Sequence, residues 1–60
     1  MKFLQVKPTQ YIIVDYNYYV EFMDDIDAWC QQCLHYQPRA GMMLDFLNER
    51  DATMFLLTWL

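Results

Sequence analysis

Hydrophobic and polar residues near the start of the chain follow a pattern typical of β-strands. Residues 2–7 (KFLQVK) place Leu4 and Val6 on the same face of an extended segment. Pro8 ends this segment, because proline has no backbone N–H for a strand ladder. Residues 10–15 (QYIIVD) contain a β-branched run that is too apolar for a half-exposed strand, which predicts the central strand of a sheet. A hairpin across Pro8 can join the two strands.

From Tyr16 onward the hydrophobic spacing changes from two residues to three or four. The residues on this stripe are Tyr19, Phe22, Ile26, Trp29 and Cys33, with Met23 and Cys30 beside them. Polar residues fall mostly on the opposite side: Glu21, Asp24, Asp25, Gln31 and Gln32. This pattern predicts an amphipathic helix of roughly eighteen residues, capped by Asp15 or Asn17. Its acids lie in the first half, where the helix dipole favours negative charge.

The last third of the chain predicts one loop, one strand and one helix. Pro38 and Gly41 are expected to end the long helix and form the loop. Residues 42–46 (MMLDF) alternate and predict a third strand. Asn48 is a good helix cap, and Asp51 occupies the position that reaches back in a capping box. The buried stripe of this helix would be Ala52, Phe55, Leu56 and Trp59. A fourth strand at MFLLTWL is the alternative, because a short apolar run fits either structure.

The expected element order is therefore β-β-α-β-α in a single small α+β domain over residues 1–60. A strand, a helix and a second strand in one sheet require a right-handed crossover and a parallel pair of strands. The predicted architecture has two layers, a three-stranded sheet with two helices on one face. The other face of the sheet would be left uncovered.

Composition indicates that the chain works through contact with another chain. Hydrophobic residues make up 57% of the 60 residues, above the roughly 45–50% of ordinary soluble domains. A chain this short buries only about 60% of the surface that it exposes when unfolded. We therefore expect contiguous exposed apolar surface, which usually marks an interaction site. The expected partners are another protein or further copies of the chain, as a homo-oligomer.

Charge and cysteine content narrow the class of partner and the compartment. The formal net charge of −4 disfavours direct binding to nucleic acid or to an anionic membrane surface. Two cysteines are too few for a secreted disulfide scaffold. The sequence shows no signal-peptide pattern and no run of the ~20 apolar residues that a membrane span needs. A cytoplasmic protein is the expectation.

The sequence gives little support for an enzyme. It has no serine and one glycine, so a serine triad and a glycine-rich phosphate loop are both excluded. Cys30 and Cys33 form a Cys-x-x-Cys pair, but they lie near the end of the predicted helix, where the dipole disfavours a thiolate. On a continuous helix His35 points away from both, and a structural zinc site needs four ligands. We expect no metal, no cofactor and no catalytic residue, with the cysteines as small core residues.

The acids of the long helix allow three interpretations. Five of the eight acids lie within thirteen residues: Asp15, Glu21, Asp24, Asp25 and Asp27. A solvated helix face, which could also hold a hard cation, is the plainest interpretation. The acids could imitate nucleic-acid phosphates, although the stripe from Glu21 to Asp27 is only about 9 Å long at 1.5 Å per residue. Electrostatic steering towards a basic patch on a protein partner is the third interpretation.

Residues 41–60 (GMMLDFLNERDATMFLLTWL) resemble the end of small reading frames of tailed bacteriophages. Those reading frames tend to end in a strand, an acidic N-E-x-D-A turn and an F-x-L-x-W segment. The matching residues here are Asn48, Glu49, Asp51, Ala52, Phe55, Leu57 and Trp59. The resemblance covers a third of the chain and carries no activity. It implies a phage accessory protein, a class that commonly acts by binding a host or phage protein.

These observations lead to one functional hypothesis and two alternatives. We expect a non-enzymatic, acidic interaction protein that binds and inhibits a host protein in the bacterial cytoplasm. The alternatives are a self-associating structural subunit and an acidic mimic that blocks a nucleic-acid-binding protein. A polar and aromatic rim would contact the partner, together with apolar residues of the last helix. The rim residues are Tyr16, Tyr18, Glu21, Asp24 and Asp25, and the apolar contacts are Met54, Leu57 and Leu60.

Overall fold

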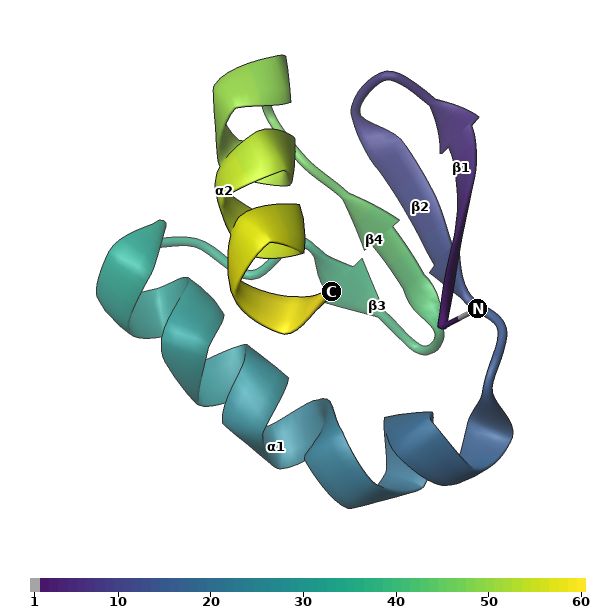
Figure 1. The fold of residues 1–60 in the computed structure, drawn as a ribbon. Coiled ribbons are helices and arrows are strands. Elements are labelled where there is room, and N and C mark those ends of the chain that lie inside the picture. Colours follow the sequence, from purple (N-terminus) through teal and green to yellow (C-terminus); the bar gives the residue numbers. More distant parts are fainter. Residues whose placement is uncertain (1) are drawn as a thin grey trace.

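A computed structural model describes residues 2–60, so Met1 of the expected domain lies outside the described residues. The elements are β1 (Phe3–Lys7), β2 (Gln10–Ile13), α1 (Tyr16–Cys33), β3 (Arg39–Ala40), β4 (Met43–Asp45) and α2 (Glu49–Trp59). They form a small α+β structure in which both helices lie on the same side of one sheet (Figure 1). The predicted α+β class with two helices is confirmed.

The sheet differs from the prediction in strand number and direction. It has four strands in the order β1-β2-β4-β3, and all three neighbouring pairs are antiparallel. The predicted three strands and the parallel pair are therefore wrong. Residues 39 and 40, which were assigned to a loop, pair with Leu44 and Met43. Gly41, with φ of +61°, lies in the turn between these strands. Because this hairpin reverses the chain after α1, β4 enters the sheet antiparallel to β2.

The N-terminal hairpin agrees with the prediction. β1 and β2 pair antiparallel across a turn at Pro8 and Thr9, and β2 lies between β1 and β4 as the predicted central strand. An irregularity between Gln5 and Lys7 shifts the register by one residue. Such a bulge bends an edge strand and increases its twist.

Specific hydrogen bonds define both ends of α1. The Asp15 carboxylate accepts a hydrogen bond from the Tyr18 N–H at 3.1 Å, so Asp15 rather than Asn17 is the cap. At the other end the Cys30 carbonyl accepts the N–H groups of both Leu34 and His35. His35 then adopts a left-handed conformation with φ of +64°.

One residue that was predicted to lie on the buried stripe of α1 is not buried. Cys33 is exposed, whereas Cys30 and Leu34 are buried. The buried line passes from Ile26 through Cys30 to Leu34 in steps of four residues, which share one side of a helix. Cys33 is turned by ~100° from Leu34 and so faces solvent.

α2 is a helix, so the alternative of a fourth strand at MFLLTWL is wrong. The Asn48 side chain accepts a hydrogen bond from the Asp51 N–H at 2.9 Å, as expected of a cap. The Asp51 carboxylate accepts a bond of 2.8 Å from the Tyr36 hydroxyl, which ties the start of α2 to the chain after α1. Ala52 and Phe55 are buried, and Leu56 and Trp59 are partly buried.

The core lies between the sheet and the two helices. Its buried hydrophobic residues are Phe3, Tyr11, Ile13, Ile26, Cys30, Leu34, Leu44, Phe46, Ala52 and Phe55. Phe55 lies at the centre of an aromatic cluster, with ring centroids 5.4 Å from Phe3, 5.3 Å from Phe46 and 5.8 Å from Trp29. Edge-on and offset aromatic pairs of this kind stabilise a core beyond their buried area. The core thus occupies one face of the sheet only.

Candidate functional site

The described part of the chain contains no enclosed site. Residues 2–60 form no pocket, and no group of three or more His, Cys, Asp or Glu side chains among them is placed to hold a metal ion. Neither helix in this range has the length and apolarity needed to cross a bilayer.

The Cys-x-x-Cys pair is divided between core and solvent. Cys30 is fully buried and Cys33 is exposed, and both thiols are free. Burial, and then the negative charge of Asp27, raise the pKa of Cys30 to about 11. Because a thiolate is the reactive form, Cys30 is a poor nucleophile at neutral pH. α1 does end at Cys33, but the exposed His35 does not join the thiols in a metal-binding group.

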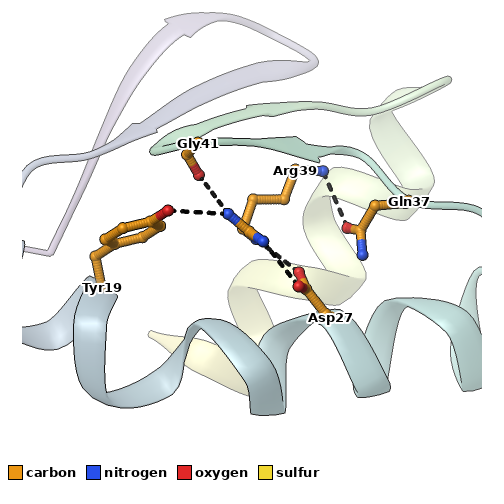
Figure 2. A network of polar contacts seen from close by, with 5 residues as sticks. All are labelled: Tyr19, Asp27, Gln37, Arg39 and Gly41. Carbon is orange, nitrogen blue, oxygen red and sulfur yellow. Dashed lines mark hydrogen bonds and ion pairs between the residues drawn. The ribbon is translucent and has the colours of Figure 1, made fainter.

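Arg39 makes the most extensive polar network in the structure (Figure 2). Its Nε and Nη2 donate to the two oxygens of Asp27 at 2.6 and 2.8 Å, which is a bidentate pair. Its Nη1 donates to the Tyr19 hydroxyl at 3.1 Å and to the Gly41 carbonyl at 2.9 Å. The hydrogen bond from Arg39 lowers the pKa of Asp27, and the same bond raises the pKa of Arg39. This clamp fastens the short edge strand β3 to α1.

The clamp reduces the predicted acidic cluster to three carboxylates. Asp15 caps the helix and Asp27 binds Arg39. Glu21, Asp24 and Asp25 remain exposed, and the Asp27–Arg39 pair is the one salt bridge within residues 2–60. These three acids share one side of α1, since they are spaced three and four residues apart. Residue spacing alone does not reveal this division, because Arg39 lies 12 residues from Asp27.

The predicted rim residues do not all lie together. Tyr16 is 66% exposed, whereas Tyr18 is partly buried against the rings of Phe3 and Phe22. The Lys2 ammonium lies 4.9 Å from the Tyr18 ring centroid, and it also donates to the Trp59 carbonyl. At ~100° per residue the two tyrosines fall on opposite flanks of the acidic side of α1. One of the two predicted rim tyrosines is thus exposed and the other is packed.

The three predicted apolar contact residues at the C-terminal end of the chain differ in their exposure. Leu57 and Leu60 are 83% and 75% exposed and lie three residues apart. Met54 is partly buried and packs against the core. Two of the three predicted side chains are therefore available to a partner.

A further exposed surface lies on the side of the sheet away from the helices. We call it the open face, and it carries Leu4 of β1, Ile12 of β2, Met43 of β4 and Ala40 of β3. Leu4 pairs with Ile12, Ile12 with Met43, and Met43 with Ala40, so these four form an apolar row across all four strands. Leu4 and Met43 are exposed, and Ile12 is partly buried.

Leu4 lies on the uncovered face that was expected, whereas the bulge between Gln5 and Lys7 interrupts the alternation that predicts Val6 beside it. The residues of that face were not among the predicted contact residues. For Leu4, the signal that could have identified it is its alternation with Phe3, once Phe3 is taken as the core residue.

The chain matches no protein-family model, no curated protein and no solved structure.

Proposed function

We propose that the protein is a non-enzymatic interaction protein that binds a basic patch on another protein. The observation that carries this proposal is the amount of large apolar side chain left exposed. The exposed set comprises Leu4, Val6, Val14, Tyr16, Val20, Met43, Leu47, Leu57 and Leu60. A monomer rarely exposes contiguous apolar patches beyond a few hundred Å² unless they contact something.

Charge supports a basic partner. Lys2 and Arg39 are two of the four lysines and arginines, and both bind groups within the molecule. The side of α1 that carries Glu21, Asp24 and Asp25 presents three exposed carboxylates. Complementary charge of this kind steers association and selects partners more than it sets affinity.

The resemblance to phage reading frames extends the proposal to where the protein acts and to its effect on the partner. A small accessory protein of this kind would act in the bacterial cytoplasm by occupying the basic surface of a host protein and so inhibiting it. The absence of a pocket among residues 2–60 and the high pKa of Cys30 favour binding over catalysis.

The test is affinity capture from bacterial lysate with two charge reversals. Asp24→Lys should lose the captured partner, and the loss should resemble the effect of raising the salt concentration. Glu49→Lys is the matched control, since it changes the same charge at an exposed position on α2. Equal capture by both variants and the wild type would contradict the proposal.

A self-associating structural subunit is the second candidate, and the apolar row across the open face favours it. The third candidate, a nucleic-acid mimic, receives less support. The three acids span only about 6 Å at 1.5 Å per residue, which corresponds to a few phosphates.

A further inference from the structure

The open face carries a second row of residues beside the apolar row. Lys7 pairs with Gln10, and Gln10 pairs with Asp45. This polar row therefore has a positive end on β1, a neutral centre on β2 and a negative end on β4. The Gln10 side chain also contacts the Met43 sulfur at 3.5 Å, which joins the polar row to the apolar row.

The two ends of the polar row carry opposite charges, which suits a symmetric pair of molecules. β1 and β4 flank β2 on either side. When two open faces meet about a two-fold axis parallel to β2, β1 of each copy lies opposite β4 of the other. Lys7 of each copy then faces Asp45 of the other, and the two apolar rows face each other. An isologous interface requires this kind of self-complementary surface.

We propose that the open face is the interface between two copies of this chain, arranged as a two-fold stack of sheets. The inference gives a geometry to the second candidate function and is independent of the acidic side of α1. Each apolar row packs on its symmetry mate as in a β-sandwich, where sheets lie about 10 Å apart. The Lys7–Asp45 contacts fix which way the two sheets face.

Edge-to-edge pairing of sheets is a poorer arrangement for this molecule. β1 is an edge strand that carries a bulge and ends at Lys7 and Pro8, and both features discourage strand addition. The other edge, β3, has two residues and is clamped to α1 by Arg39. The exposed apolar side chains thus lie on the face of the sheet rather than along a usable edge.

Size and charge are consistent with a dimer. A standard interface uses about 800 Å² per partner, roughly a fifth of the 3949 Å² surface of the chain. Most of the open face must therefore be used. The helices lie on the outer sides of such a stack, so the acidic sides of α1 are separated by more than the ~8 Å Debye length and repel weakly.

Sedimentation velocity across a concentration series tests the proposal. The wild type should pass from monomer to dimer, and Met43→Glu should remain monomeric. Leu57→Glu is the matched control, because Leu57 is an exposed apolar residue on α2 and lies away from the open face. Circular dichroism checks that each variant is folded.

Exchanging the charges of Lys7 and Asp45 is a second, independent test of the dimer. Lys7→Glu and Asp45→Lys should each weaken the dimer by about tenfold, since each removes both symmetry-related contacts. The double variant should recover wild-type affinity, because the pair is restored with its signs exchanged. Dimerisation lost in Leu57→Glu but kept in Met43→Glu would overturn the proposed face. A wild type that stays monomeric at every concentration, or a double variant without recovery, would overturn the dimer or its two-fold geometry.

Binding of a lysate protein through Asp24 would be unaffected by the Lys7 and Asp45 variants. Failure of the dimer can therefore be distinguished from failure of the proposed function.

Discussion

The two faces of the sheet differ in what covers them, although both are rich in apolar residues. Leu44 and Met43 are neighbours on β4, yet Leu44 is fully buried and Met43 is 40% exposed. The same contrast holds on β1, where Phe3 is buried and Leu4 is exposed. Apolar character alone therefore does not decide which side of a strand becomes core. What decides it is which face the two helices can cover.

The largest expected difference between the faces is the stability cost of truncation. Leu44→Ala should lower the free energy of unfolding by about 2–5 kcal/mol, because it leaves a cavity between the sheet and both helices. Met43→Ala should cost less than about 1 kcal/mol, since its side chain is already partly in water. Urea denaturation at low protein concentration measures both. Similar costs for the two variants would contradict the one-sided core.

The two cysteines sharpen the comparison between core and solvent on α1. Iodoacetamide should modify Cys33 at least about a hundredfold faster than Cys30, because the Cys30 thiol is buried and its high pKa keeps it protonated. Mass spectrometry after timed labelling gives the two rates. In the Cys33→Ala variant the remaining thiol should react only after urea is added. Rapid labelling of that variant without urea would show that the helix layer opens readily.

The Arg39–Asp27 clamp tests what holds the edge of the covered face. Asp27→Asn should cost about 1–2 kcal/mol, a value reduced from that of a buried charged pair because both side chains are partly exposed. Asp24→Asn is the control and should change stability by less than about 0.5 kcal/mol. Urea denaturation compares the two at pH 7. An equal effect of both substitutions would mean that the clamp contributes nothing specific.

The clamp also predicts a pH dependence of stability. Arg39 lowers the pKa of Asp27 in the folded protein, while the unfolded carboxylate has its ordinary pKa of about 4. The unfolded state therefore takes up the proton first as pH falls. The stabilisation is complete above the unfolded pKa and is lost as pH falls towards the lower folded value. The free energy of unfolding of Asp27→Asn should therefore vary less with pH than that of the wild type in this range.

Sequence reasoning succeeded where the determining contact is local. The caps of both helices lie three residues from the N–H groups that they bind, at Tyr18 and Asp51. A residue pattern of that length is visible without a structure. The N-terminal hairpin is equally local, because its strands adjoin one turn.

The errors arose where the determining contact is distant or very short. β3 has two residues, too few to show any periodicity, and its direction sets that of β4. Alternation predicts that Leu4 and Val6 share a face, but it cannot show the bulge between Gln5 and Lys7, and the choice of face depends on helices far along the chain. The same limit applies to the acidic cluster, because only the folded structure removes Asp27 from it.

The smallest expected effect concerns the end of α1, which leads the chain to the edge of the covered face. His35 and Gly41 both adopt left-handed conformations, at φ of +64° and +61°. This conformation costs a residue with a side chain about 1–2 kcal/mol, whereas glycine adopts it freely. His35→Gly should therefore stabilise the protein by about 0.5–1 kcal/mol, after the greater freedom of glycine in the unfolded chain is subtracted.

His35→Ala is the control for His35→Gly, because it removes the imidazole and keeps the backbone cost. Gly41→Ala supplies the opposite change and should destabilise the protein by about 1 kcal/mol. A Cβ at Gly41 would meet no atom within 4 Å, so this loss is conformational rather than steric. Thermal denaturation of the three variants should rank His35→Gly above His35→Ala and both above Gly41→Ala. Equal stability of the two His35 variants would mean that α1 does not end in a left-handed residue, and the path from α1 into β3 would then differ from the one described.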